Sequence, residues 1–142
     1  MDDAAEIADL SDQLGYPASV DEMSDRLIRL LADPDYFIAV ADNADGPLLG
    51  WIGAEYRVLL ELGAEIEIVG LVVRRETRRS GVGKALLAAA EDWARGHGLE
   101  SIRVRSNVAR PDSHPFYERM GYARIKTQHC YRKGLDRPND AA

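Results

Sequence analysis

The spacing of apolar residues predicts two helices in the first part of the chain. From Asp3 to Leu14, apolar residues recur at helical intervals and form one stripe. The segment GYPAS interrupts this pattern, and SVDEMSDRLIRLLADP resumes it. In the second segment Ser19 suits the N-cap, acidic residues occupy the first turn, and Pro34 follows the end. We therefore expect two consecutive helices.

Three strands are predicted next, from short runs of apolar residues. The runs are YFIAVA (36–41), LLGWIGAEYRVLL (48–60) and AEIEIVGLVV (64–73), and the turn segment DNADGP predicts that the first two form a hairpin. In the third run Glu65 and Glu67 alternate with isoleucines, whereas the second half is apolar throughout. This change predicts a strand that passes from half-exposed to fully buried as it enters the middle of a sheet.

The remaining chain predicts a helix, a strand, a short helix and a last strand. The segment KALLAAAEDWARGHG (84–98) has an apolar helical face and ends at Gly96 or Gly98. The segments SIRVRSN, DSHPFYERM and YARIKTQHCYRK follow, before a frayed tail over residues 134–142. This order predicts one α/β domain over residues 1–142, with a mixed sheet flanked by helices. The expected buried face of the helix comprises Leu86, Leu87, Ala90, Trp93 and Ala94.

The composition fits a folded domain in a reducing compartment. Of the 142 residues 46% are hydrophobic, and the net charge is −6. A negative chain is a poor partner for nucleic acid, but its surface attracts cationic small molecules. The single cysteine, Cys130, forms no internal disulfide, no apolar run reaches the ~20 residues of a membrane span, and the acidic start lacks the features of a signal peptide. We expect a cytoplasmic protein without nucleic-acid or membrane partners. The three histidines and the cysteine show no metal-ligand spacing, so we expect no metal.

The loop RRSGVGKALL (78–87) is the first candidate for a binding site. Two glycines and several cations precede a helix, whose first N–H groups lack partners and carry a partial positive charge. Because glycine lets the backbone approach a phosphate closely, the loop is typical of an anion site. It lacks the Ser or Thr that follows Lys84 in a P-loop, and Leu86 stands where a dinucleotide fingerprint has its third glycine. A basic, solvated turn that caps an ordinary helix remains the alternative.

This loop and a second segment resemble a known family. VVRRETRRSGVGKALL is similar to the acetyl-CoA loop of the GNAT superfamily of N-acetyltransferases, whose pattern Gln/Arg-x-x-Gly-x-Gly/Ala falls on Arg78, Gly81 and Gly83. HPFYERMGYARI resembles the family's aromatic-Tyr-Glu-x-x-Gly-aromatic segment, and SIRVRSN lies between the two. The resemblance covers about residues 14–133 and implies a mixed, mostly antiparallel central sheet flanked by helices. The family's usual first strand, ahead of the first helix, is not recognised in this sequence, so either it is missing or another segment covers that edge of the sheet.

The resemblance implies acetyl-CoA as the co-substrate. Its diphosphate is expected at backbone N–H groups of the glycine loop, and its pantetheine arm alongside the preceding strand, like an added β-strand. Asn107 is expected to bind the coenzyme or to hold the end of its strand, although a lengthened loop places Arg110 in competition for this role. The expected coenzyme-binding residues are Leu71, Val72, Val73, Arg78, Arg79, Ser80, Gly81, Val82, Gly83, Lys84 and Asn107.

The resemblance also implies catalytic residues. Glu67 is the expected general base, because it falls where the histone-acetyltransferase branch of the family has its glutamate. Glu65, two residues away on the same strand face, and Trp51 are expected to contact the acceptor. Tyr117 is the expected general acid, with its hydroxyl directed at the sulfur of the coenzyme. The alternatives are that both glutamates face solvent on an alternating strand, and that Tyr117 and Trp51 serve only packing.

The resulting hypothesis is an enzyme that moves acetyl from acetyl-CoA to a primary amine of a small molecule, by direct attack in a ternary complex. The alternative from another class is a non-catalytic acyl-CoA-binding sensor or partner subunit. The residues do not choose among aminoglycosides, polyamines and other amines. Because a missing first strand leaves a sheet edge uncovered, we also expect a homodimer.

Overall fold

The computed structural model describes residues 3–78, 80–105 and 113–136. Arg79 and Asn107, two of the expected coenzyme-binding residues, lie outside these ranges, as does Arg110. The chain forms two compact units, residues 1–107 and residues 108–142.

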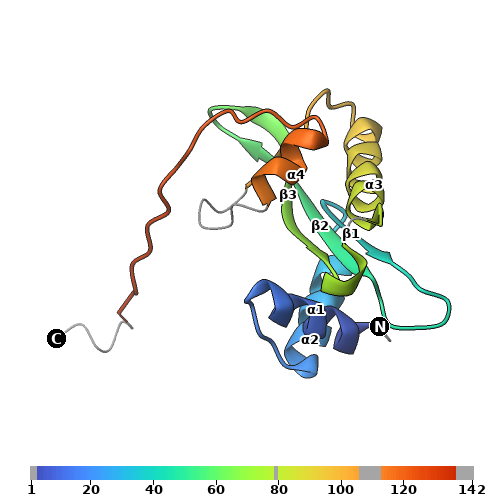
Figure 1. Cartoon of the computed structure of the whole chain (residues 1–142). Coiled ribbons are helices and arrows are strands. Elements are labelled where there is room, and N and C mark those ends of the chain that lie inside the picture. Colours follow the sequence, from blue (N-terminus) through green and yellow to red (C-terminus); the bar gives the residue numbers. More distant parts are fainter. Residues whose placement is uncertain (1–2, 79, 106–112, 137–142) are drawn as a thin grey trace. The chain divides into compact units, whose positions relative to one another are not determined.

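A four-stranded sheet forms the centre of the first unit (Figure 1). Its strands are β1 (Tyr36–Ala41), β2 (Gly50–Leu59), β3 (Gly63–Val73) and β4 (Arg103–Val104), in the order β1-β2-β3-β4. β1 and β3 both run antiparallel to β2, and β4 runs parallel to β3. The prediction of a mixed, mostly antiparallel sheet is therefore confirmed.

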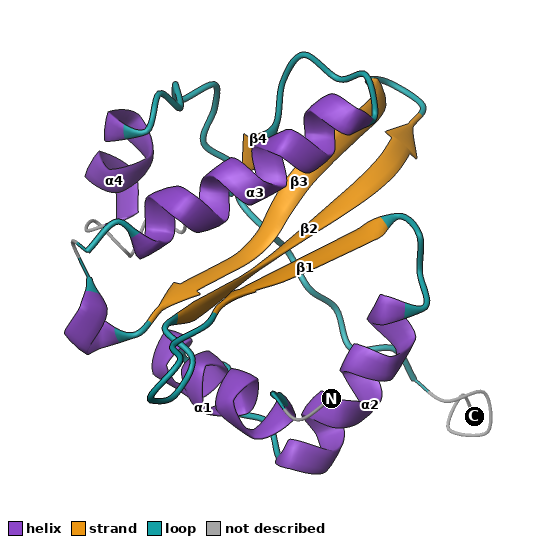
Figure 2. Ribbon diagram, turned by 90° about the vertical axis from the view of Figure 1, so that its right-hand side faces the viewer, coloured by secondary structure: helices purple, strands orange, loops and turns teal. Residues whose placement is uncertain are grey.

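Helices cover both faces of this sheet. Figure 2 shows α3 (Val82–Gly96) on one face, and α1 (Ala4–Leu14) and α2 (Val20–Leu31) on the other. The predicted N-cap of α2 is confirmed, because the Ser19 hydroxyl accepts a hydrogen bond from the Glu22 N–H at 3.0 Å. The Glu22 carboxylate in turn accepts one from the Ser19 N–H at 2.9 Å. This reciprocal pair satisfies two N–H groups that the start of a helix leaves unpaired.

Each face of the sheet has its own hydrophobic contacts. Under α1 and α2 the core includes Leu10, Leu27 and Val72, all buried. On the other face, four of the five residues predicted for the buried face of α3 are buried, and Trp93 is half-buried. The Trp93 ring stacks on Phe37 of β1 with a centroid distance of 5.3 Å. Burial on both faces fixes the orientation of the sheet between the helices.

A bulge in β3 decides which of its side chains face α1 and α2. Val72 belongs to the core on that side. The pairing register between β2 and β3 shifts at Val69, which has no partner in β2. Because side chains alternate along a strand, an unbroken β3 would place Ile68 on the face of Val72. The extra residue instead places Glu67 and Glu65 there.

The burial of β3 runs opposite to the prediction. The expected half-exposed end is the buried one, since Glu65 and Glu67 are 9% and 4% exposed. In the apolar half, expected to be fully buried, Val69 is 46% exposed. The prediction was wrong because the pattern of residue types does not reveal that arginines on neighbouring strands can cover a carboxylate.

The second unit contains the short helix α4 (Ser113–Arg119). The predicted last strand, YARIKTQHCYRK, is wrong, because residues 123–133 have no regular secondary structure. A strand exists only where its N–H and C=O groups pair with a neighbouring strand, and this segment pairs with none of the described strands. Its apolar side chains are correspondingly exposed, with Ile125 at 73% and Tyr131 at 89%.

Among the helices of the described residues, none has the length and apolar character that a membrane span requires.

Candidate active site

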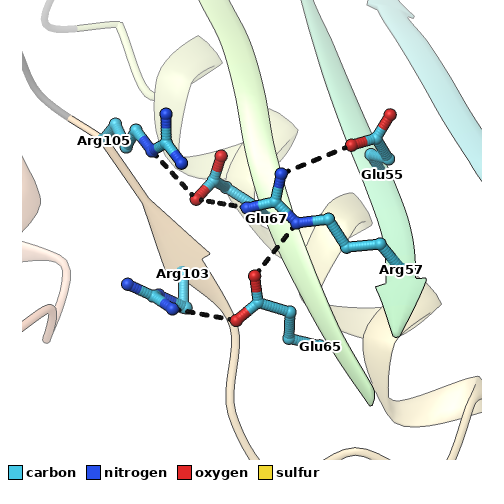
Figure 3. Close-up of polar contacts among 6 residues, drawn as sticks. All are labelled: Glu55, Arg57, Glu65, Glu67, Arg103 and Arg105. Atoms are coloured by element: carbon cyan, nitrogen blue, oxygen red, sulfur yellow. Dashed lines mark hydrogen bonds and ion pairs between the residues drawn. The ribbon is translucent and has the colours of Figure 1, made fainter. Parts of the chain in front are cut away.

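The β3 carboxylates lie within a cluster of charged residues on the sheet face that carries α1 and α2. Figure 3 shows that its members come from β2, β3 and β4, and from Arg105, the residue directly after β4. The three carboxylates and three guanidiniums give it no net formal charge. We call this set the charged cluster; it comprises Glu55, Arg57, Glu65, Glu67, Arg103 and Arg105.

Glu67 is held by two arginines of this cluster. Its Oε1 lies 3.0 Å from Nη2 of Arg57 and 3.3 Å from Nε of Arg105. The Glu67 side chain is 5% exposed, whereas that of Arg105 is 68% exposed. A buried carboxylate between two guanidiniums has a fixed position, which a group that transfers a proton requires.

Both carboxylate oxygens of Glu65 are bound by arginines. Its two oxygens accept hydrogen bonds from Nε of Arg57 at 3.0 Å and from Nη1 of Arg103 at 2.9 Å. Burial alone would raise the pKa of Glu65, but these hydrogen bonds and charges hold it below its ordinary value. Glu65 therefore stays ionised near neutral pH and fixes the position of Arg57, which also contacts Glu67.

A cavity of about 380 Å³ opens on the same face of the sheet, between the strands and the helices α1 and α2. Gly53 and Gly70 face each other across β2 and β3 at its floor. A Cβ at Gly53 would lie 2.9 Å from the Tyr36 hydroxyl, and one at Gly70 would lie 2.7 Å from the Trp51 ring. The paired glycines thus make room for two aromatic side chains that line the cavity.

Strand register brings the charged cluster next to this cavity. Tyr36, a lining residue, pairs with Glu55 of β2, and Glu55 pairs with Glu67 of β3. The three side chains therefore lie in one row across the sheet, on the face of the cavity. Burial, and then the negative charge of Glu55, raise the pKa of Tyr36. Of the two residues predicted to contact the acceptor substrate, Trp51 lines the cavity and Glu65 lies in the charged cluster beside it.

The glycine loop leads from β3 through a short 3-10 helix (Arg75–Thr77) into α3. Gly81 is the N-cap of α3 with a φ of 89°, and a Cβ there would meet nothing within 4 Å. The first helical hydrogen bond runs from the Ala85 N–H to the Gly81 carbonyl at 3.0 Å. The N–H groups of residues 82–84 therefore precede the helical ladder, and no hydrogen bond from them to another described residue is found.

The charged and polar side chains of this loop surround that helix start. Arg78, Ser80 and Lys84 are exposed. The Ser80 hydroxyl donates a hydrogen bond to the Thr77 carbonyl, which orders the turn. Two cations beside the first N–H groups of a helix make the loop electropositive within a negatively charged chain.

The edge of β3 that faces away from β2 is paired with β4 at only two positions. These are Glu67 with Arg103 and Ile68 with Val104. Beyond them, residues 69–73 have no strand on this side among the described residues. The Val73 carbonyl, in the segment expected to bind pantetheine, accepts a hydrogen bond from the Gln13 amide at 3.0 Å. The rest of this edge offers backbone groups to an extended ligand.

In the second unit, Tyr117 is packed among aromatic rings. Its ring centroid lies 5.2 Å from that of Phe116 and 5.9 Å from that of Tyr122. Burial raises the pKa of Tyr117 to about 12. The phenol is therefore protonated at neutral pH, as a proton donor must be.

Sequence reasoning missed the arginines of the charged cluster and the glycine pair under the cavity. Arg57 pairs with Glu65 across the β2–β3 hairpin. Counting outward from the turn would have suggested this ion pair. No local signal identifies Arg103 as the second partner of Glu65, because the two residues are 38 positions apart. The bulge at Val69 likewise has no signature in the residue types.

Comparison with known proteins identifies the family of this chain. The model of the acetyltransferase (GNAT) family matches residues 4–122, which run through both units. The chain is 30% identical over 138 residues to an aminoglycoside N(6')-acetyltransferase type 1 of Stenotrophomonas maltophilia, covering 94% of this chain and 89% of that protein. It is 34% identical over 114 residues to an aminoalkylphosphonate N-acetyltransferase of Salmonella typhimurium, covering 80% and 71%.

A third relative and a solved structure are also similar to this chain. An uncharacterized N-acetyltransferase of Bacillus subtilis, YhdJ, is 41% identical over 71 residues, and the match spans about half of its length, 50%. The fold is that of the aminoglycoside N-acetyltransferase AAC(6')-Iy solved in complex with CoA, with a TM-score of 0.81 and 21% identity over 93% of this chain and 89% of that one.

This chain therefore belongs to the acetyltransferase (GNAT) family. As a member of that family it is an acyltransferase of the N-acetyltransferase type.

Proposed function

We propose that this protein transfers acetyl from acetyl-CoA to a primary amine of a small molecule, by direct attack within a ternary complex. The observation that carries the proposal is the place of Glu67. Its buried carboxylate lies in one row with Glu55 and the cavity residue Tyr36, one residue before the pairing of β4 with β3 ends. A base at this point can accept a proton from an amine in the cavity while that amine attacks a thioester that lies along the strand edge.

The residues of the loop and the β3 edge fit acetyl-CoA. The N–H groups of residues 82–84 and the exposed cations Arg78 and Lys84 suit the diphosphate, and Gly81, which has a positive φ, places no side-chain atoms beside it. The unpaired edge of β3 suits the amide groups of the pantetheine arm. We assign the coenzyme to Leu71, Val72, Val73, Arg78, Arg79, Ser80, Gly81, Val82, Gly83, Lys84 and Asn107.

The chemistry requires a neutral amine and a protonated leaving group. A typical alkylamine is protonated at pH 7, so Glu67 accepts its proton, directly or through a water molecule. The amine nitrogen then bonds to the thioester carbonyl carbon, the carbon–sulfur bond breaks, and the second proton of the nitrogen passes to the phenolate that Tyr117 becomes when it protonates the sulfur. Tyr117, whose pKa of about 12 keeps it protonated, returns a proton to the sulfur. Glu65 and Trp51 hold the acceptor side of the site.

One observation favours a second candidate, a non-catalytic acyl-CoA-binding sensor or partner subunit. The carboxylates of Glu65 and Glu67 are both engaged by arginines, as in a cluster that only stabilises the fold. Under that candidate the glycine loop still binds the coenzyme. Neither Glu67 nor Tyr117 is then needed for chemistry.

Thiol release from acetyl-CoA with a panel of amines separates the two candidates. We expect Glu67→Gln and Tyr117→Phe each to lower kcat by about 100-fold or more, since general acid–base groups contribute on that order. Calorimetry should show unchanged affinity for acetyl-CoA. Glu61→Gln and Tyr131→Phe, both at exposed positions, serve as matched controls. Wild-type turnover in both active-site variants would show that the roles are wrongly assigned.

We also propose a homodimer, because β1 and β4 are the outer strands of the described sheet and each leaves one edge without a strand partner. Sedimentation velocity would show a species of twice the chain mass. A monomer at micromolar concentration would contradict this.

A further inference from the structure

The lining of the cavity limits which amine can bind there. Its walls are mostly apolar, with Ile7, Met23, Leu27, Leu30, Ile38 and Trp51 among them. Arg26 of α2 is the charged residue among the described lining residues, and no carboxylate lines the cavity itself. The charged cluster lies beside the cavity, so one amine can reach a carboxylate there while the rest of the ligand cannot.

A cavity with apolar walls, one arginine and no carboxylate among its described lining residues disfavours a ligand with several positive charges. A ligand with several ammonium groups would lose water from each of them against apolar side chains, and burying a charge without a partner is costly. The guanidinium of Arg26 would also repel them. An apolar ligand body, in contrast, gains from contact with aliphatic and aromatic walls, and 380 Å³ lies within the usual range for small-molecule pockets.

Arg26 adds a preference for an anion. It is exposed at the edge of the cavity, and no ion pair within 4.0 Å involves it among the described residues. Hydrogen bonds from the Ser19 backbone and side chain lower the pKa of Glu22, and the charge of Arg26, one helical turn away, lowers it further. A carboxylate or phosphonate on the ligand would therefore meet an available guanidinium.

Resting on the proposed function, we infer that the acceptor is an amphipathic primary amine: one ammonium, an apolar body, and an acidic group at the end that meets Arg26. The ammonium lies toward Glu55 and Glu67, the body fills the cavity, and the acid pairs with Arg26. Aminoglycosides do not fit this class.

Three probes of equal chain length test the inference, because they differ only in the group at the far end. They are 6-aminohexanoate, hexylamine and 1,6-diaminohexane, and kanamycin represents the aminoglycosides. Binding is measured by calorimetry on protein saturated with coenzyme A, which does not depend on turnover. We expect 6-aminohexanoate to bind about threefold to tenfold more tightly than hexylamine, as for a partly exposed ion pair. The diamine and kanamycin should bind more weakly than both.

Substitution of Arg26 should change this order. In Arg26→Gln the advantage of 6-aminohexanoate over hexylamine should disappear, and in Arg26→Glu the diamine should bind best. Arg29→Gln, an exposed arginine on the same helix that does not line the cavity, should keep the wild-type order.

The outcomes distinguish this inference from the proposed function. Tighter binding of kanamycin or the diamine to the wild-type protein, or no binding of any probe, would overturn the inference. If the expected binding order is found but no amine releases thiol from acetyl-CoA, the ligand class stands and the catalytic proposal fails. If kanamycin alone is acetylated, catalysis stands and the inference fails.

Discussion

Arg57 joins the three carboxylates of the charged cluster, so its removal should destabilise the fold. It lies 3.6 Å from Glu55 and 3.0 Å from both Glu65 and Glu67. Arg57→Met leaves the two β3 carboxylates, 9% and 5% exposed, with one cation each. Removing one partner of a fully buried ion pair costs about 3–5 kcal/mol. Because Arg57 itself is 28% exposed, we expect a smaller loss in the free energy of unfolding, about 2–3 kcal/mol.

Urea denaturation at pH 7, followed by circular dichroism, measures this loss. The matched control is Arg105→Met, which removes a guanidinium that contacts Glu67 at 3.3 Å but is 68% exposed. Its loss should be below about 1 kcal/mol, as for an exposed ion pair. Equal losses in the two variants would refute the reasoning, because burial would then not decide the value of these ion pairs.

The loss in the free energy of unfolding caused by Arg57→Met should also depend on pH. Burial acts to raise the pKa of Glu65, but hydrogen bonds from Arg103 and Arg57 lower it by more, so the pKa lies below its ordinary value. A carboxyl group whose pKa is lowered by folding stabilises the folded state above its unfolded pKa, and this stabilisation is lost as the pH falls through the folded pKa. The difference between wild type and Arg57→Met should therefore be full near pH 7 and shrink below about pH 4. A deficit that grows on acidification would contradict this account.

Three further substitutions test other parts of the structure. Ser19→Ala removes the capping box of α2 and should lower the free energy of unfolding by about 1 kcal/mol in urea denaturation; an unchanged midpoint would exclude a role for the cap. Gly81→Ala forces a Cβ onto a backbone with a φ of 89°, so the loop should be strained by about 1–2 kcal/mol. Calorimetry should then show weaker acetyl-CoA binding, and wild-type affinity would count against this loop as the diphosphate site. Gly70→Ala brings a Cβ within 2.7 Å of the Trp51 ring, so KM for the acceptor should rise severalfold while acetyl-CoA affinity is kept. A change in coenzyme affinity alone would contradict the place given to the cavity.

Local patterns predicted the elements that depend on local physics. The residues Tyr36–Ala41 form a strand at the predicted bounds, and Ser19 caps α2 as its residue type indicates. The helix after the glycine loop begins at Val82, two residues before the predicted Lys84, because Gly81 itself provides the N-cap. In each of these cases neighbouring residues carry the information.

The features that escaped prediction depend on distant partners. Glu65 is buried because Arg57 and Arg103 cover it, and alternation along β3 carries no trace of either. The last predicted strand failed for the converse reason, since residues 123–133 alternate suitably but lack a described neighbour. The site residues themselves were nominated by family resemblance, and their roles remain predictions.

A crystal structure with coenzyme A bound would test the central claim most directly. The account predicts the diphosphate at the N–H groups of residues 82–84, the pantetheine arm along the outer edge of β3, and the sulfur close to Glu67. A structure that shows the coenzyme bound elsewhere, with the start of α3 free of phosphate, would contradict it.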